Sequence, residues 1–486
     1  MNMKHLITTC LIAAATTLGS ACSNWLDVQP YDQISEEQLF SSEEGFQKLL
    51  NGIYIELCST DLYGGALGPE MIEVMGGAYE IGDDAVKWGN YPDLKRYDYA
   101  SDYWRDRLDA TWNKAYSLIL NCNKLLEGLQ GREALFAPGH AAIIRGEALA
   151  LRAMLHFDLL RLFGPVYSQQ PGAPAIPYYT SRTTTPEPRL AASAVTEHIL
   201  ADLARARADL SADPVLTEGT LMSADPSGGS SFLRYRALRL NYYAVAALEA
   251  RVQLYAGNRS EAFTRAMEVI RAADRGIFPF VGRASVVGTE DPDRIFSTEV
   301  LFALSHNNRN QIFLDYFSPT RTTFVFKMES ALIDQVIYGG GQTTGGYQDD
   351  YRNRVGWSTS GSNRYFYKYA DMENTGAIEN TMIPMLRLGE MYLIAAEAQS
   401  DNLINGTSYV NILRSNRGIS TTLPALTQEL LVYEYIRELY GEGQLFFLYK
   451  RLNTTIIRSA TPSLNTLPGS NVFVVPLPDS ETDNIQ

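Results

Sequence analysis

The sequence has few basic residues for its length. Its 41 Lys and Arg residues are outnumbered by 55 Asp and Glu residues, which gives a formal net charge of −14. An acidic protein repels a phosphate backbone and the sequence shows no basic patch, so we expect no nucleic acid partner. No run of 18 apolar residues follows the N-terminal segment. We therefore expect no transmembrane helix in the mature chain.

Cysteine is also scarce, with four residues in 486. Cys10 lies in a segment that we expect to be removed, which leaves Cys22, Cys58 and Cys122. Cys58 and Cys122 fall in predicted helices among apolar residues. A disulfide between them is compatible with a location outside the cytoplasm, but two buried thiols are the favoured interpretation. The number is too small for a disulfide scaffold.

The common catalytic motifs are missing. The sequence has no Gly-x-Ser-x-Gly, no His-Glu-x-x-His and no phosphate-binding glycine loop. The acid pairs Asp83-Asp84 and Asp349-Asp350 fall in predicted loops, where they are solvated or bind Ca²⁺ at most. The mature chain keeps four histidines, none at metal-ligand spacing: His140, His156, His198 and His306. We expect a protein that is not an enzyme and that needs no cofactor or metal.

The first 21 residues have the pattern of a secretory signal peptide. A short polar start precedes the apolar run 6–18, which is too short to span a membrane in the mature protein. Gly19, Ser20 and Ala21 then lead to Cys22. This order resembles a bacterial lipobox, in which the cysteine is lipidated and becomes the new N-terminus, although Gly19 stands where the usual Leu would be. Ordinary cleavage is the alternative.

The remainder of the chain is dominated by helical periodicity. Apolar residues from Phe46 to Leu57 follow a three-four spacing, and the turn Gly257-Asn258 joins two further helices. Ala250, Gly257 and Ala262 match the small-residue spacing of a tetratricopeptide unit, with an isolated helical hairpin as the alternative. We expect further helices at 141–163, 190–210, 232–256, 260–273, 383–400, 408–417 and 428–452, and short strands at 300–304 and 472–475.

Aromatic residues are abundant, with 29 Tyr, 19 Phe and 5 Trp. Many lie in the long irregular stretches 64–98 and 338–365, and loops of this length usually carry function. Aromatic faces bind the C–H faces of sugars, and neighbouring polar groups bind the hydroxyls. Trp104 and Trp112 share a helix face and are expected in the core. The predicted ligand-binding residues form two groups: Trp88, Tyr91 and Tyr97, then Tyr347, Tyr351 and Trp357.

Several segments in order resemble the SusD/RagB family of nutrient-binding outer-membrane lipoproteins. The similarity runs from Cys22 to the last residue. The departure is at 444–447, where the family commonly has Arg-x-Phe-Asp and this chain has Gln-Leu-Phe-Phe. The matching segments are CSNWLDVQP, TWNKAYSLILNCNKLLEGL, RGEALALRAMLHFDLLRLFGPV, PMLRLGEMYLIAAEA and IRELYGEGQLFFLYKRLN.

The resemblance implies a mainly α fold. Tetratricopeptide-like helix pairs would form a right-handed superhelical scaffold, with a few short strands in a loop-rich binding lobe. One SusD-like domain would span 22–486, with the scaffold mainly at 42–274 and 383–452 and the lobe at 64–98 and 275–382. The motif Asp350-x-Arg352 would be structural.

The resemblance also implies a function. Such a protein is anchored to the outer membrane through the lipid on Cys22 and exposed at the cell surface. There it binds oligosaccharides and delivers them to a SusC-like TonB-dependent transporter. Peptide capture is the alternative within the family, and a secreted glycosidase or a purely structural adaptor are the alternatives outside it.

Overall fold

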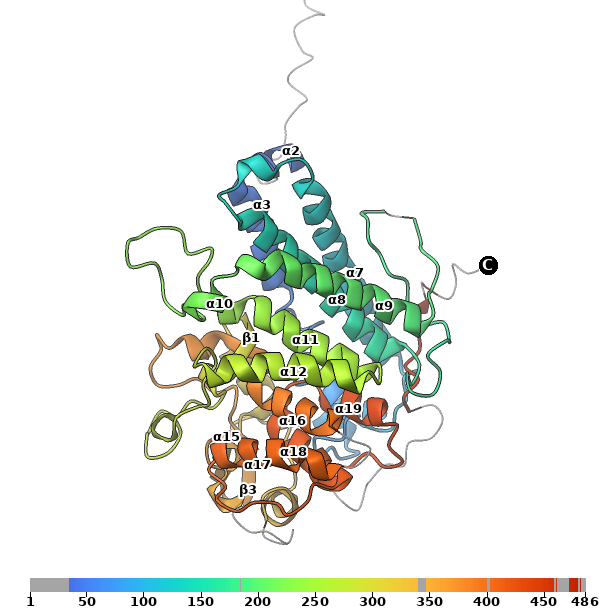
Figure 1. Ribbon diagram of the computed structural model, residues 1–486. Coiled ribbons are helices and arrows are strands. Elements are labelled where there is room, and N and C mark those ends of the chain that lie inside the picture. Colours follow the sequence, from blue (N-terminus) through green and yellow to red (C-terminus); the bar gives the residue numbers. More distant parts are fainter. Residues whose placement is uncertain are drawn as a thin grey trace, which may run out of the picture.

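The computed structural model describes residues 35–183, 185–339, 347–399, 403–458, 460, 472–479 and 481. The predicted signal peptide and Cys22 lie outside these residues. The fold is mainly helical, as expected, with two small two-stranded sheets (Figure 1). Among the described residues, no helix is both long enough and apolar enough to cross a membrane.

The helix α8 (His140–Phe163) is the centre of the N-terminal half. Twenty of its residues are buried, most of them apolar. The helices α7 (Asp102–Leu129) and α9 (Ala192–Asp209) pack against it. The helix α3 (Glu43–Glu56) contacts α7 and begins at Ser42, whose side chain accepts a hydrogen bond from the Gly45 amide.

The predicted helix pair around Gly257 is present as α11 (Tyr242–Tyr255) and α12 (Arg259–Asp274). Gly257 has a φ of 81°, which a residue with a side chain adopts at a cost. Ala250 and Ala262 are fully buried, so the two helices approach closely. Figure 1 shows α9, α11 and α12 stacked one below the other, and α12 packs in turn on α16 (Leu388–Ala398). The pair is therefore part of a longer stack and not an isolated hairpin.

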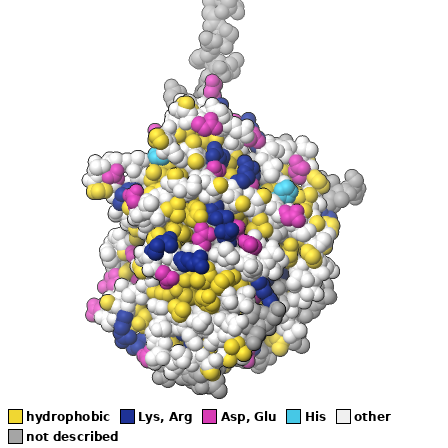
Figure 2. All heavy atoms as spheres, viewed as in Figure 1, with side chains coloured by type: hydrophobic (Ala, Val, Ile, Leu, Met, Phe, Trp, Pro, Cys, Tyr) yellow, Lys and Arg dark blue, Asp and Glu magenta, His cyan; other side chains and the backbone are white. Residues whose placement is uncertain are grey.

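Ion pairs connect successive helices of this stack. Glu249 of α11 binds Arg207 of α9 at 3.2 Å and Arg265 of α12 at 3.1 Å. Figure 2 shows Lys and Arg side chains lying among hydrophobic ones over α11 and α12, with hydrophobic side chains gathered below them over α16. Deeper in the stack, Arg152 of α8 binds Asp202 of α9 at 2.7 Å. These pairs fix the register of neighbouring helices.

The segment 428–452 forms two helices, so the expectation of a single helix is wrong. The helix α18 (Gln428–Leu439) ends before Gly441, and α19 (Leu445–Leu452) starts after Gly443. Both glycines have positive φ, at 76° and 70°. A Cβ at Gly443 would lie 2.0 Å from the Leu67 carbonyl oxygen. The close approach of the 64–98 loop therefore requires the break.

Two antiparallel sheets complete the fold. The strand β1 (Val300–Ser305) is confirmed and pairs with β4 (Met382–Arg387), so the helix expected from 383 begins only at Leu388. The strands β2 (Trp357–Ser360) and β3 (Asn363–Phe366) form a hairpin. The strand expected at 472–475 is wrong, because residues 472–473 form a turn and residues 474–475 belong to no strand.

Shorter elements lie between the main ones. The helix α17 (Thr407–Asn416) packs on α16. The remaining α-helices are α2 (Glu36–Leu39), α4 (Met71–Met75), α5 (Ala85–Trp88), α6 (Tyr91–Lys95), α10 (Val215–Glu218), α13 (Asn310–Ile312), α14 (Ser330–Leu332) and α15 (Tyr351–Gly356). Single turns of 3₁₀- or π-helix are η1 (Glu133–Leu135), η2 (Leu210–Ala212), η3 (Arg236–Leu238), η4 (Arg283–Ser285), η5 (Ser297–Glu299), η6 (Phe313–Phe317), η7 (Ile333–Ile337), η8 (Tyr347–Asp349), η9 (Ile378–Thr381) and η10 (Leu403–Gly406).

Cys58 and Cys122 are free thiols. Cys122 is buried, as expected, whereas Cys58 is half-buried and its thiol lies 3.6 Å from the Ser305 carbonyl oxygen.

Candidate functional site

Aromatic side chains from two distant parts of the sequence meet beside the start of α7. The Tyr91 ring lies 5.5 Å from that of Trp104 and 4.9 Å from that of Phe324, centroid to centroid. Trp88 stacks on Phe324 at 6.2 Å with an angle of 23° between the planes. The sequence predicted the ligand-binding residues of the segment 88–97, and the fold brings Phe324 and its neighbours to them.

Tyr103 contacts Trp104 at 5.0 Å, and Tyr316 stacks on Phe326 at 5.6 Å, so both belong to the same cluster. Four residues of this cluster reach solvent, and we call them the aromatic surface: Tyr91, Tyr103, Tyr316 and Phe324. Tyr103 is 44% exposed and the other three are half-buried. Trp88, the lead sequence candidate, is only 6% exposed and supports Phe324 from below. Tyr97 is half-buried and donates a hydrogen bond to the Met75 carbonyl. Trp104 is fully buried, as its helical spacing predicts.

A buried carboxylate holds the polar side of the aromatic surface. Glu70 accepts a hydrogen bond from the Tyr91 hydroxyl at 2.9 Å and from Arg107 Nη2 at 2.6 Å. Arg107 also binds Asp61 at 2.7 Å and lies one turn after Tyr103 on α7. Burial, and then the Glu70 charge, raises the pKa of Tyr91 and of Tyr103. Both phenols are therefore neutral at physiological pH. The Tyr103 hydroxyl can donate a hydrogen bond to a ligand, whereas the Tyr91 hydroxyl already donates to Glu70 and can only accept one.

A second charged group, the guanidinium of Arg321, lies beside Phe324 of the aromatic surface. The Arg321 guanidinium sits over the Phe324 ring at 4.5 Å, and its Nε donates to the Phe324 carbonyl at 2.9 Å. Asp315 lies 3.9 Å from Arg321 Nη1. The rim of the aromatic surface therefore has both hydrogen-bond donors and hydrogen-bond acceptors. This arrangement suits a ligand with apolar faces and polar edges.

The second predicted group lies inside the protein. Tyr347 is 1% exposed, and its ring lies between the guanidinium groups of Arg414 at 4.6 Å and Arg437 at 4.0 Å. Tyr351 is buried against Gly418, and Trp357 is buried against Tyr440. In this conformation none of the three offers a free ring face, because tertiary contacts cover them.

Buried rings nevertheless connect the two groups. Trp357 contacts Tyr440 at 5.0 Å, Tyr440 contacts Tyr79 at 5.8 Å, and Tyr79 stacks on Phe326 at 4.3 Å. Phe326 in turn lies 5.0 Å from Tyr91 of the aromatic surface. Trp357 of the second group therefore supports the aromatic surface from the interior.

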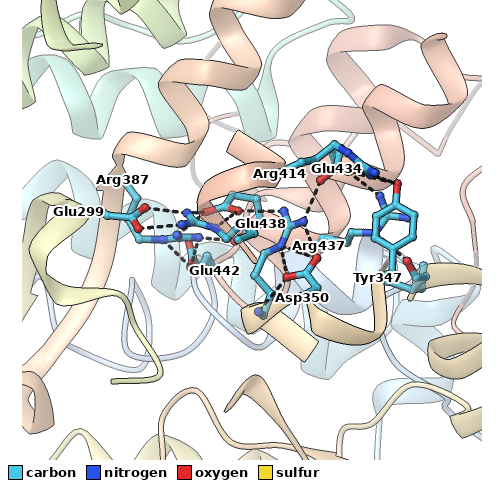
Figure 3. A network of polar contacts seen from close by, with 12 residues as sticks. Glu299, Tyr347, Asp350, Arg387, Arg414, Glu434, Arg437, Glu438 and Glu442 are labelled. Atoms are coloured by element: carbon cyan, nitrogen blue, oxygen red, sulfur yellow. Dashed lines mark hydrogen bonds and ion pairs between the residues drawn. The ribbon is translucent and has the colours of Figure 1, made fainter. Parts of the chain in front are cut away.

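Tyr347 lies at one end of a network of buried ion pairs that extends toward Glu299 and Arg387 (Figure 3). Arg352 binds Asp350 at 2.7 Å, Glu434 at 3.0 Å and Glu438 at 3.1 Å, so the Asp350-x-Arg352 motif has the structural role that was expected. Glu438 is also bound by two other guanidinium groups. Burial alone would raise the pKa of Glu438, but these three guanidinium groups outweigh burial and hold it well below its usual value. The further members are Glu299, Lys368, Arg387, Arg414, Arg417, Arg437 and Glu442.

The acid pairs considered for Ca²⁺ or for glycosidase chemistry have other partners. Asp84 caps α5, and Asp83 lies 3.3 Å from Arg96. Asp350 belongs to the buried network and Asp349 binds Arg354 at 3.0 Å. Within the described ranges, no group of three or more His, Cys, Asp or Glu side chains could hold a metal ion.

A separate pocket of about 360 Å³ lies further along α7. Trp112, Tyr116 and Tyr179 form its aromatic wall, and Asn113 and Ser117 are among its polar groups. Trp112 is 2% exposed, in agreement with its predicted core position. This pocket is the second place where a ligand could be held.

Sequence reasoning missed Tyr316, Phe324, Glu70 and Arg107. Phe324 and Phe326 alternate in the stretch RTTFVF at 321–326, and this alternation was the available signal. Glu70 and Arg107 carry no local signal, because their importance comes from a contact between residues 37 positions apart.

Two family models match the chain. One, described as "Starch-binding associating with outer membrane", covers residues 24–224, and the other, described as "SusD family", covers residues 294–463. Among curated proteins, SusD-like protein P38 of Formosa agariphila is 22% identical over 94% of this chain and 93% of its own length. SusD-like protein P25 of the same organism is 20% identical over 58% of this chain, and the match spans about half (49%) of P25.

Solved structures share the fold. A SusD-like carbohydrate binding protein from Bacteroides vulgatus has a TM-score of 0.65 at 20% identity, covering 91% of this chain and 96% of that one. A SusD superfamily protein from Bacteroides thetaiotaomicron has a TM-score of 0.64 at 20% identity, with coverage of 91% and 98%. A laminarin binding SusD-like protein has a TM-score of 0.60 at 15% identity, with coverage of 91% and 97%.

Proposed function

Because the chain belongs to the SusD/RagB family of non-catalytic, outer-membrane-associated binding proteins, we propose that it captures an oligosaccharide at the aromatic surface. The anchor is the lipid on Cys22, which holds the protein at the outside of the outer membrane. The ligand is then passed to a SusC-like TonB-dependent transporter. The observation that carries the proposal is the set of solvent-facing rings built around the Glu70–Arg107 pair.

The exposed rings provide the apolar contact. Tyr103 projects from α7 into solvent, and Phe324 is supported from behind by Trp88 and Phe326. A ring that is fixed by its neighbours loses little conformational entropy when a ligand stacks on it. The aromatic surface is therefore preorganised for the C–H face of a sugar ring.

The polar rim provides the hydrogen bonds. Arg107 and Tyr91 are held in place by Glu70, and Asp61 is 37% exposed at its side chain. Sugar hydroxyls both donate and accept, so a rim that holds a guanidinium, carboxylates and phenols can bind several of them. Rigid partners of this kind select the orientation of the ligand.

Two alternatives remain as outcomes of the test. A peptide ligand would suit the 360 Å³ pocket beside Trp112, which combines aromatic walls with amide and hydroxyl groups. A glycosidase would need two carboxylates facing each other across a cleft, whereas the acid pairs singled out in the sequence are engaged with arginines or a helix cap.

Isothermal titration calorimetry against a panel of glycans tests the binding site. We expect Tyr103→Ala and Phe324→Ala each to weaken glycan binding by about tenfold, which corresponds to about 1.4 kcal/mol and to the loss of one stacking contact. Trp88→Ala should weaken binding less, because it removes only support. Tyr409→Ala on α17, where the ring contacts Phe263, is the matched control and should leave affinity unchanged.

Equal affinities for Tyr103→Ala, Phe324→Ala and the wild type would refute the aromatic surface as the site. Binding of peptides in place of every glycan would favour the alternative ligand.

For the anchor, Cys22→Ala should release the protein from membranes after fractionation, since the acyl chains are the attachment. A variant that stays in the membrane fraction would refute lipidation at this cysteine.

A further inference from the structure

A small cavity of about 20 Å³ lies beneath Trp357, between α18 and the segment that leads from α15 into β2. Aromatic rings form much of its wall, including those of Trp357, Tyr338 and Tyr440. A cavity needs about 10–15 Å³ to hold one water molecule. The cavity therefore has room for a single small species and excludes a sugar or a peptide.

The wall of this cavity is strongly basic. Its lining includes five basic side chains and one carboxylate, Glu438: the basic ones are Arg294, Arg352, Lys368, Arg387 and Arg437. Arg352 and Arg387 share Glu438. Both also bind carboxylates that do not line the cavity: Asp350 and Glu434 for Arg352, and Glu442 for Arg387. Lys368 binds Glu442. The carboxylates that offset these charges thus lie mostly away from the cavity, and the side facing it is positive.

Two of the arginines that line this cavity each have a buried guanidinium nitrogen with no partner among the described residues. Arg437 is 3% exposed; its Nε donates to the Ile337 carbonyl at 2.7 Å and its Nη1 to Glu434 at 3.0 Å, but its Nη2 has no acceptor. On the opposite segment, Nη1 of Arg294 is buried without an acceptor. A buried donor on a charged group is costly to leave unpaired.

The electrostatics around Arg294 agree with this picture. Burial lowers the pKa of Arg294, and the nearby Asp291 and Asp293 offset this effect only in part. Burial also lowers the pKa of Arg309, and the like charge of Arg294 lowers it further. The buried carboxylate of Glu73 accepts hydrogen bonds from the amides of 441, 444 and 445 and does not line the cavity.

We propose that this cavity is a binding site for one small monovalent anion of the size of chloride, held between Arg294 Nη1 and Arg437 Nη2. An anion accepts both hydrogen bonds and reduces the excess of positive charge, whereas a water molecule would do only the first. The anion connects the loop that carries Arg294 to α18 beneath β2. The proposal is independent of what the aromatic surface binds.

Crystals of the wild-type chain soaked in sodium bromide test the site directly. We expect an anomalous peak within hydrogen-bonding distance of Arg294 Nη1 and Arg437 Nη2. Bromide peaks at other places, with only water density in this cavity, would overturn the proposal. This measurement needs no variant and therefore does not depend on how a substitution folds.

Thermal unfolding tests the same site in solution. When sodium chloride replaces sodium gluconate at constant ionic strength, the Tm of the wild type should rise, because the anion binds the folded state. Arg294→Gln removes one donor and one charge and should lose this rise. The control Arg283→Gln changes an exposed arginine of the same loop that does not line the cavity, and should keep it. No rise in the wild type, or an equal rise in Arg294→Gln, would overturn the proposal.

Discussion

The charge on Glu438 is a direct test of the buried network. Glu438 lies on α18 with 1% of its surface exposed. Its carboxylate binds Arg387 Nη1 at 2.6 Å, Arg417 Nη2 at 2.6 Å and Arg352 Nη1 at 3.1 Å. Glu438→Gln keeps the shape of the side chain but removes the negative charge, so three guanidinium groups lose a shared partner.

The burial of Glu438 sets the expected loss in the free energy of unfolding. Removing one partner of a buried ion pair costs about 3–5 kcal/mol, since the remaining charge is left uncompensated in a low-dielectric interior. Glu429 on the same helix is the matched control, because it binds Arg458 at 2.8 Å with 59% of its side chain exposed. Exposed pairs contribute about 0–1 kcal/mol. Glu438→Gln should therefore lower the free energy of unfolding by at least about 2 kcal/mol more than Glu429→Gln.

Urea unfolding, followed by circular dichroism and by tryptophan fluorescence, measures the difference. The pKa of Glu438 is lower in the folded state than in the unfolded state, where it is about 4.5. The charged carboxylate therefore contributes fully to the free energy of unfolding above about pH 4.5, and this contribution is lost as the pH falls from 4.5 through the folded-state pKa. The gap between the wild type and Glu438→Gln should shrink on acidification. Coincident midpoints for Glu438→Gln and Glu429→Gln at pH 7 would refute this account of the network.

Three further outcomes follow from single buried groups. Burial raises the pKa of Glu73 to about 7. Raising the pH from about 4.5 to 7 should therefore lower the free energy of unfolding by about 3 kcal/mol, because the unfolded state ionises more easily. Urea titrations of Glu73→Gln should lack this decrease with pH. Gly389→Ala places a Cβ 2.3 Å from Glu438 Oε1 and should destabilise the protein by about 1–3 kcal/mol, so an unchanged Tm would contradict the packing. Burial raises the pKa of Cys58 and Cys122 to about 12, so both should resist alkylation at pH 8 in mass spectra until the protein is unfolded; rapid labelling of the native state would contradict this.

Local pattern accounts for the elements that the sequence placed correctly. The helix expected at 141–163 is α8 (His140–Phe163), and its end at Gly164 follows from the Gly-Pro step. The strand expected at 300–304 is β1, a short run of apolar residues. The mainly α fold and its family were also predictable, because helical periodicity and the order of short motifs are properties of neighbouring residues.

The candidate site was only half predictable. Tyr91, one of the predicted ligand-binding residues, lies in the aromatic surface, whereas Trp88 and Tyr347 are covered by other parts of the chain. Exposure is decided by which segments pack together, and the sequence of a loop does not contain that information. The partners Tyr316 and Phe324 come from more than 200 positions away.

The sequence by itself determined that this chain is acidic, helical, rich in aromatic loops and similar throughout to one family, since each of these follows from composition or from local order. Only the tertiary structure decided where 428–452 breaks, which rings reach solvent and how the charges at 438 and 442 are neutralised. The physical reason is that burial and ion pairing depend on contacts between distant residues. Those contacts form only when the loop 64–98 and the C-terminal helices meet.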